Sequence, residues 1–520
     1  MIWLLKDKWS IRIRLSFLLV LLLNVSGFSQ PTFINKYTIN PNDGDELRSI
    51  LEVNGGYVFY NSSVVSEPFT QVQGGLLHVD PNGEEVWSTR WDFPEGRIGI
   101  SFEDALFLKG DSVVAIANYR NESVFSNYGI VVTDLSTRNS RLIRYTDSIP
   151  RFAGSIYSFG EDDLIFTGSL LIGREGYSPL AVSWLRGLND ELNYTTYLED
   201  HYWVFSNSSA VNKNKEIFAA FRGCKNREDC WQIEGGLLKV KADGEIGWIR
   251  EYGVTADNQR VIPQVTVLND TTIAYSWTRD TNNLDIQESP PIIYFLDTLG
   301  NKRDSLEIHG NWRTLTNLRA TANGDLIGSG VAWTDIGWCG WMVRVSPEAE
   351  LIWERYVQDH RDSPNARTGF NEVVEDCEGY IVGAGYVAES QFPEDGSSPL
   401  KAWVVKLDAD GCLEPGCSSD TIYLEDPVAI EEVLSASSNL VELFPNPAKN
   451  FINLKIGTPP WLTNGGDYQI ISSSGRIYAQ GAFIGQTQQI PIADLPNGLY
   501  FLKLEVDGRI LGSVRFVKAS

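Results

Sequence analysis

The stretch GGLLHVDPNGEEVW at Gly74–Trp87 recurs as GGLLKVKADGEIGW at Gly235–Trp248. Each copy alternates apolar and other residues, reaches an Asn-Gly or Asp-Gly pair, and ends on a tryptophan. Such a pair between two alternating runs is the strongest short signal for a β-hairpin, because both turn residues tolerate positive φ. The repeated phrase therefore predicts the same hairpin at two places in one chain.

Further copies of the phrase reveal a longer period. GWMVRVSPEAELIW at Gly340–Trp353 and AWVVKLDADGCLEPGC at Ala402–Cys417 are clear copies, and weaker ones begin at Tyr128, Leu180 and Ile292. A second series of short strands joined by tight turns runs between them, with turns near Gly55, Gly110, Glu161, Asn214, Asp270, Gly324 and Gly379. Two interleaved series with one period of roughly fifty residues predict four short strands per unit, the size of a propeller blade.

We therefore predict an all-β protein with a seven-bladed β-propeller over residues 30–417. Trp87, Trp248 and Trp353 fall at one position of the outermost strand, where we expect them to pack between blades. In the last copy Pro415 replaces this tryptophan, and proline is disfavoured within a sheet. We expect residues near Thr32–Thr38 to supply the missing outer strand and to close the ring.

The first 29 residues have the pattern of a signal peptide. Basic residues precede the apolar run Leu15–Leu23, and the small residues Gly27 and Ser29 favour cleavage before Gln30. Nine apolar residues are too few to cross a bilayer, and no later run is long enough, so we expect no transmembrane segment in the mature chain. The formal net charge of −24 excludes nucleic-acid binding through clustered cations.

Long connections alternate with the tight turns and should gather on the opposite face of the propeller, the usual place for function. We call this face the long-loop face and define it by these connections: Asp92–Glu103, Asn118–Asn127, Arg222–Trp231, Thr278–Pro290, Trp333–Cys339, Gln358–Gly369 and Ala388–Pro399. Seven tryptophans lie in or beside it, namely Trp203, Trp231, Trp277, Trp312, Trp333, Trp338 and Trp341. Their rings are candidates for stacking on a ligand, and the alternative is that they anchor the loops.

The six cysteines favour disulfides, because the count is even and the chain is exported. Cys224 and Cys230 would close a small loop, and Cys377 could pair with either Cys412 or Cys417. Cys339 has no evident partner. We expect no metal site, since there is no CxxC motif and the four histidines are isolated in the sequence.

After Cys417 the composition changes. Residues 418–439 are acidic and serine-rich, which indicates a linker. Residues 440–520 contain alternating strands separated by glycine turns, which predicts a small Ig-like β-sandwich.

Four motifs in this segment carry a resemblance to a known family: Pro445-Asn446-Pro447, Ser474-Gly475-Arg476, Leu495 with Gly498-Leu499-Tyr500, and Arg515-Phe516-Val517-Lys518. In this order they resemble the type A C-terminal sorting domain of the Bacteroidota type IX secretion system. The resemblance implies interaction with the secretion machinery and its sortase, removal of the domain, and release or surface attachment of the protein. The repeats before Cys417 are similar to those of secreted Bacteroidota propeller proteins.

No catalytic motif or cofactor fingerprint is present, and we expect no cofactor. The acidic residues Asp162, Asp163, Asp376 and Glu378 lie at expected turns, where aspartate shapes the backbone, and the Asp408–Gly411 phrase also reads as a turn rather than a calcium loop. The leading hypothesis is a non-catalytic propeller that binds a glycan or a protein. The alternatives are a polysaccharide hydrolase or lyase with carboxylates on the long-loop face, and a structural surface component.

Overall fold

The structure of the protein is a computed structural model. It describes residues 32–519 except 40–43, 66–70, 92–96, 100–105, 122–123, 145–150, 160–162, 171–177, 187, 189–192, 226–231, 257–262, 279–289, 311–312, 336, 362, 364–365, 390–399, 425–440, 457–465, 473–476, 484–486 and 507–508. The chain forms two units: residues up to 423 make the first, and the C-terminal residues, together with 360–364, make the second. The expected signal peptide lies outside the described residues.

Seven antiparallel sheets make up the first unit, and we number them as blades in chain order. Blades 1 to 3 contain β2 (Gly44–Val53), β3 (Gly56–Val65), β4 (Gln71–Val79) and β5 (Glu85–Arg90); β6 (Arg97–Gly99), β7 (Leu106–Lys109), β8 (Ser112–Asn121), β9 (Val124–Asp134) and β10 (Ser140–Arg144); and β11 (Arg151–Phe159), β12 (Asp163–Leu170), β13 (Leu180–Arg186) and β14 (Asn193–Tyr197). In blade 2 both β6 and β7 pair with β8.

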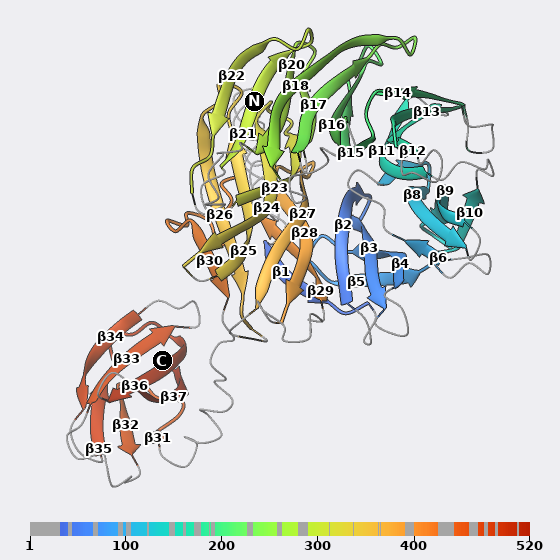
Figure 1. The fold of residues 1–520 in the computed structure, drawn as a ribbon. Helices are drawn as coiled ribbons and strands as arrows, with labels where there is room; N and C mark the ends of the chain where they lie inside the picture. Colours follow the sequence, from blue (N-terminus) through green and yellow to red (C-terminus); the bar gives the residue numbers. More distant parts are fainter. Residues whose placement is uncertain are drawn as a thin grey trace, which may run out of the picture. The chain divides into compact units, whose positions relative to one another are not determined.

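Blades 4 to 7 repeat this order. They contain β15 (Trp203–Val211), β16 (Ile217–Cys224), β17 (Gln232–Val240) and β18 (Ile246–Ala256); β19 (Gln264–Asn269), β20 (Thr272–Thr278), β21 (Pro291–Asp297) and β22 (Lys302–Glu307); β23 (Arg313–Ala320), β24 (Leu326–Thr334), β25 (Gly337–Val345) and β26 (Leu351–Asp359); and β27 (Arg367–Glu375), β28 (Ile381–Ala388), β29 (Leu400–Leu407) and β1 (Phe33–Tyr37). Adjacent blades contact each other through their first strands, and β27 of blade 7 contacts β2 of blade 1, so the ring is closed (Figure 1). The predicted seven-bladed propeller is confirmed.

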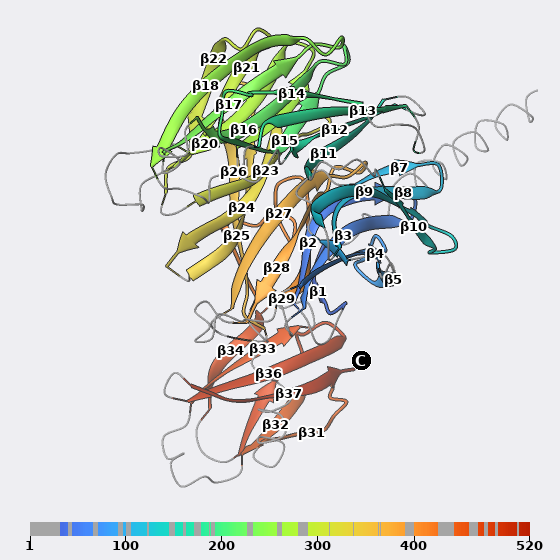
Figure 2. The same ribbon diagram turned by 45° about the vertical axis from the view of Figure 1, so that its right-hand side comes forward.

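The N-terminal strand β1 supplies the outer strand of blade 7. It pairs antiparallel with β29, from Phe33 opposite Lys406 to Tyr37 opposite Ala402, and it lies beside β29 in both ribbon views (Figures 1 and 2). The pairing places the segment where sequence analysis expects it, and it covers an edge that would otherwise present unpaired backbone groups.

The linker interpretation of residues 418–439 is wrong at one point. Thr421–Leu424 form β30, a fifth strand on the outer edge of blade 6 beside β26. The backbone N–H of Tyr356 donates to the carbonyl of Asp420 at 2.8 Å, just before this strand begins. β26 offers an open edge here, so a short alternating segment is captured by the sheet although it belongs to no repeat.

The tryptophan at the end of the repeated phrase lies against the next blade where its contacts are clearest, in blades 4 and 6. Trp248 donates its indole N–H to the carbonyl of Thr298 at 3.0 Å, and Trp353 donates to Ala409 at 3.3 Å. Both acceptors lie in the outer hairpin turn of the following blade. Trp87 and Trp353 are buried and Trp248 is half-buried. The phrase recurs because it makes the same contact between blades.

The turn glycines take part in the same contact through their carbonyl oxygens. Gly83 accepts a hydrogen bond from the hydroxyl of Tyr37 at 2.8 Å, and Gly244 accepts one from Tyr197 at 2.7 Å. Each donor lies on the outer strand of the preceding blade. These glycines have φ of 89° and 88°, a conformation that only glycine adopts without strain.

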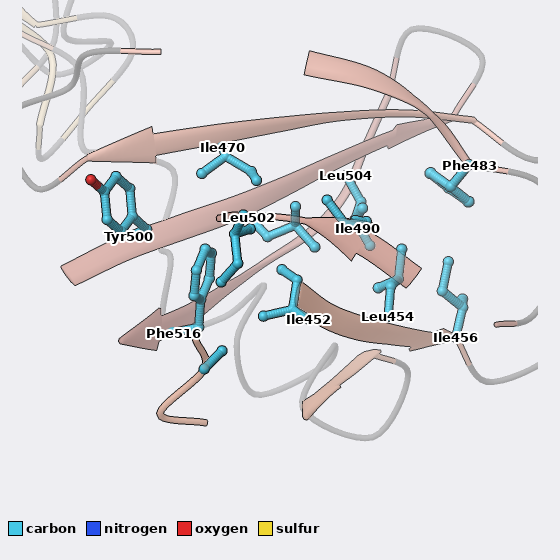
Figure 3. Close-up of a cluster of buried hydrophobic side chains, with 12 residues drawn as sticks. Ile452, Leu454, Ile456, Ile470, Phe483, Ile490, Tyr500, Leu502, Leu504 and Phe516 are labelled. Atoms are coloured by element: carbon cyan, nitrogen blue, oxygen red, sulfur yellow. The ribbon is translucent and has the colours of Figure 1, made fainter. Parts of the chain in front are cut away.

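The second unit is a sandwich of two sheets. One contains β31 (Val441–Phe444), β32 (Phe451–Ile456) and β35 (Thr487–Pro491), and the other contains β33 (Gly466–Ser472), β34 (Ile477–Phe483), β36 (Gly498–Val506) and β37 (Arg509–Lys518). Ile452 and Leu454 of the first sheet face Leu502 and Phe516 of the second in a buried core (Figure 3). The expected small β-sandwich is confirmed. Within the described part of the chain, no helix has the length and hydrophobicity of a membrane span.

Candidate ligand-binding face

The two hairpin turns of a blade lie at the same end of its sheet. In blade 4 the turns at 212–216 and 241–245 are closed by backbone hydrogen bonds and join the first strand to the second and the third to the fourth. In an antiparallel sheet of consecutive strands these two connections share one end. The starts of β15 and β17, and the ends of β16 and β18, therefore point to the long-loop face.

Two of the candidate tryptophans are brought together on this face. Trp333, near the end of β24, pairs with Trp338, near the start of β25. Their ring centroids are 5.3 Å apart with an interplanar angle of 79°, and both side chains are half-buried. Trp203, at the start of β15, is also half-buried but belongs to blade 4. These three rings remain candidates for contact with a ligand.

Two other candidates are core residues. Trp277 is 3% exposed and Trp341 is fully buried, so neither ring can stack on a ligand in this structure. The ring of Trp277 lies against Gly235, where an added Cβ would stand 2.2 Å from it, and Trp341 packs beneath the guanidinium of Arg313. Trp277 lies near the end of β20 and packs on blade 4, whereas Trp341 lies in the middle of β25 within the core shared by blades 5 and 6. Trp231 and Trp312 lie outside the described residues.

A polar group that sequence analysis missed lies on the innermost strands of blades 7 and 1, with Tyr386 added from β28, the second strand of blade 7. Asn371 donates from its amide to Glu46 Oε1 at 2.8 Å, and Arg48 forms an ion pair with Glu46 Oε2 at 2.7 Å. The guanidinium of Arg367 lies over the ring of Tyr386. Burial, followed by the Glu46 carboxylate, raises the pKa of Tyr386. We call these five residues the inner-strand cluster.

The inner-strand cluster depends on backbone irregularities that carry no simple sequence signal. The register of β2 shifts between Leu47 and Ser49, and that of β27 shifts between Phe370 and Glu372. Arg48 and Asn371 are the extra residues at these bulges. A bulge bends its strand and redirects a side chain, and bulges are common beside functional sites.

A second polar group lies on the long-loop face of blade 4. His201, which is 2% exposed, precedes β15, while Glu234 and Glu251 lie on β17 and β18. Lys225, just after β16, contacts Glu234 Oε2 at 3.1 Å and Glu251 Oε1 at 3.0 Å. One ligand atom from each of His201, Glu234 and Glu251 lies within 4.8 Å of the others, the one such group that could hold a metal among the described residues.

Carboxylates at the expected turns shape the backbone. Asp376 Oδ1 accepts the backbone N–H of Glu378 at 3.0 Å and that of Tyr380 at 2.8 Å, while its other oxygen accepts the hydroxyl of Tyr57 at 2.6 Å. Asp408 accepts the N–H groups of Asp410 and Cys412 in the same way. These contacts occupy both carboxylate oxygens of Asp376 and the Oδ1 of Asp408, and they favour the turn interpretation over acid–base chemistry. Asp162 lies outside the described residues.

The disulfides follow the prediction in part. Cys224 is disulfide-bonded, as expected. Cys412 and Cys417 are joined to each other, with their Cα atoms 5.6 Å apart, a pairing that sequence analysis did not consider. Cys230 lies outside the described residues. Cys377 is free, contrary to the expectation that it could pair with Cys412 or Cys417. Cys377 is held on the inner hairpin turn by its N–H bond to Glu52, whereas Gly416 turns the chain so that Cys417 returns to Cys412.

We expect the two free thiols to react at very different rates. Cys377 is exposed, whereas Cys339 is fully buried on β25, and burial raises the pKa of the Cys339 thiol to about 11. Because the thiolate is the reactive form, an alkylating reagent should label Cys377 in the native protein and reach Cys339 only after unfolding. Peptide mass mapping after timed labelling measures this, with Cys377→Ser as the control. Native labelling of Cys339 at a similar rate would contradict the expectation.

The residues of the proposed sorting motifs gather at the last strand of the sandwich. Asn446 accepts the N–H of Val517 at 2.9 Å, Gly498 pairs with Lys518, and the ring of Tyr500 stacks on Phe516 with centroids 5.7 Å apart. Pro445 and Pro447 flank Asn446 in the connection from β31 to β32, and Gly475 lies outside the described residues. Motifs that are scattered in sequence therefore support one edge of the domain.

Comparison with known families decides the nature of this second unit. Residues 442–517 match the secretion system C-terminal sorting domain. This sorting domain covers the sandwich, and it places the protein outside the cell or at the cell surface, by type IX secretion. No curated protein matches the chain.

Comparison with solved structures gives distant likenesses. An α-L-arabinofuranosidase from Fusarium graminearum with an iminosugar inhibitor is 12% identical, with 73% of this chain and 98% of that chain covered and a TM-score of 0.39. YCF48 bound to D1 peptide is 10% identical, with 73% and 96% covered and a TM-score of 0.39. These likenesses carry no argument about activity or ligand.

Proposed function

We propose that the propeller is a non-catalytic binding domain that holds a carbohydrate on its long-loop face. The observation that supports this most is the half-buried Trp333–Trp338 pair, because two rings set at 79° form a corner against which a sugar ring can stack. The hairpin of β24 and β25 holds both rings through direct cross-strand pairing, so the corner needs no rearrangement to bind.

The inner-strand cluster would add hydrogen bonds near the propeller axis. Arg48, Asn371 and Glu46 bond one another across adjacent first strands, so a ligand there would share or replace these hydrogen bonds. The other possible ligand is a protein, and the binding experiment described below distinguishes the two. A hydrolase or lyase is disfavoured, since the buried carboxylates Asp45 and Glu372 are engaged by their neighbours: Asp45 accepts from Ser63 and Asn61, and Glu372 accepts the N–H of Ile50.

The sorting domain would deliver this binding domain to the surface. We propose that it engages the type IX machinery and is removed by the sortase, after which the propeller is released or attached to the surface. The exported chain would then carry the long-loop face into contact with polysaccharides outside the cell.

A glycan array with the purified protein tests the proposal. We expect binding to at least one glycan, weakened about tenfold or more by Trp338→Ala, because a ring that stacks on a ligand contributes about 0.5–1.5 kcal/mol beyond its buried area. Trp248→Ala, a half-buried ring at the contact between blades 4 and 5, is the matched control and should bind normally. Binding that survives the Trp333→Ala, Trp338→Ala double substitution, binding to proteins alone, or release of sugars from a polysaccharide would each contradict the proposal.

A further inference from the structure

In the blade 4 group of His201, Glu234 and Glu251, the buried Nε2 atom of His201 has no hydrogen-bond partner. His201 Nδ1 lies 2.8 Å from Asp200 Oδ1, and its Nε2 faces Glu234 Oε2 at 3.6 Å. The Asp200 carboxylate oxygen is placed to accept the Nδ1 proton. In the neutral imidazole, Nε2 is then a lone-pair acceptor.

Two buried acceptors therefore point at each other. His201 is 2% exposed and its Nε2 has no hydrogen-bond partner, while Glu234 Oε2 is contacted by the Lys225 ammonium at 3.1 Å. Burying acceptors that face each other is costly unless a proton or a cation lies between them. The distance of 3.6 Å is too long for a hydrogen bond but suits two ligands of one metal ion.

The charge of the group also favours a cation. The carboxylates of Asp200, Glu234 and Glu251 are opposed among the described residues by the ammonium of Lys225, which lies 3.1 Å from Glu234 Oε2 and 3.0 Å from Glu251 Oε1. Lys225 is 39% exposed and can swing into solvent, whereas His201 is fixed by Phe221 on one side and by Asp200 on the other. A carboxylate that holds the second nitrogen of a histidine is the usual support for a metal-binding histidine.

We infer that His201 Nε2, Glu234 and Glu251 bind a divalent transition-metal ion of the zinc class, with Lys225 as the counter-ion that the metal displaces. One imidazole and two carboxylates suit zinc, which takes bonds of about 2.0–2.2 Å to such ligands and keeps a fourth position open for water or a ligand group. Three ligand atoms within 4.8 Å of one another need a small inward movement, which half-exposed Glu251 can make. The site lies at the ends of β16 to β18 and is independent of the Trp333–Trp338 corner.

Sequence analysis predicts no metal because the histidines look isolated. The three ligands are at positions 201, 234 and 251, and they meet because Gly236 pairs with Glu251 across β17 and β18 while the segment before β15 approaches the end of β16. The spacing of these residues in the sequence matches no metal-binding motif, so it could not predict that they meet. The hydrogen bonds from the N–H of Tyr202 to the carbonyls of Cys224 and Lys225 hold the two segments together.

Calorimetric titration of the full chain, first stripped with a chelator, with Zn²⁺ tests the site. We expect one site per chain that is lost in His201→Gln and in Glu251→Gln, weakened about 10–100-fold in Asp200→Asn, and tightened up to about tenfold in Lys225→Met, which removes the competing ammonium. Glu251 is 50% exposed, so its variant should fold even if the buried His201 variant does not. Co²⁺ should bind in the same place and show the visible absorption of a four-coordinate ion.

The matched control is His309→Gln. His309 lies 3.7 Å from Glu307 and is 80% exposed, and it forms a histidine–carboxylate pair with no third ligand among the residues that the structure describes. We expect this variant to bind Zn²⁺ as the wild-type protein does. Unchanged uptake in Glu251→Gln, no tightening in Lys225→Met, or equal affinity for Ca²⁺ and Zn²⁺ would overturn the inference, because a plain ion-pair group would give each of these results.

Discussion

The Tyr37→Ala variant should lose about 3–5 kcal/mol of unfolding free energy, the range for removing a buried aromatic ring. Tyr37 lies on β1, is 6% exposed, and packs with Phe33 among residues of blades 7 and 1. Its hydroxyl also donates to the carbonyl of Gly83 in the outer turn of blade 1. Loss of the ring loosens the strand that closes the propeller. Urea unfolding followed by tryptophan fluorescence measures the effect.

Two controls separate the parts of this effect. Tyr37→Phe keeps the ring and removes only the hydrogen bond, so we expect a loss of about 1 kcal/mol. Ile352→Ala removes a similar apolar side chain that is 49% exposed on the outer strand of blade 6, and its effect should be within about 0.5 kcal/mol. If Tyr37→Ala were no more destabilising than Ile352→Ala, β1 would not be holding the ring closed.

The architecture was predictable because each blade requires the same tight hairpin turns and the same contact with the next blade. The Asn-Gly and Asp-Gly turns at Gly83 and Gly244 have the positive φ that the hairpin requires, and the absence of a normal outer strand after Leu407 pointed to β1. Strand β30 was missed because Thr421–Leu424 lie outside the period. The edge of β26 decides their structure, and an edge is a property of the assembled sheet.

The candidate sites were much less predictable. Sequence analysis treated the tryptophans of the long-loop face as one set, but burial separates Trp277 and Trp341 from Trp333 and Trp338. The burial of each ring depends on how the neighbouring blade packs against it, which cannot be deduced from the position of the residue in the sequence. The His201 group and the inner-strand cluster come from segments that meet only in three dimensions, and their residue types are ordinary surface types when read singly.

The glycine that opens the repeated phrase should be as constrained as its turn glycine. A Cβ at Gly235 would stand 2.2 Å from the ring of Trp277, and one at Gly74 would stand 2.8 Å from the ring of Trp91. An aromatic ring from outside the phrase thus fills the space that each glycine leaves. We expect Gly235→Ala to cost about 1–3 kcal/mol through overpacking of this contact, although the alanine itself favours the strand.

A double-mutant cycle makes the cause of this loss testable. Trp277→Ala should cost about 3–5 kcal/mol, and in its background Gly235→Ala should cost little, because the ring that the new methyl group would strike is gone. Gly247→Ala is the control within the same blade: Gly247 is exposed, and its nearest neighbour is the flexible side chain of Lys239 at 3.1 Å. Urea unfolding of the four variants gives the coupling energy between positions 235 and 277. Simple additivity of the two substitutions would show that the glycine is not there to admit the ring, and Trp277 would again have to be considered for a role outside the core.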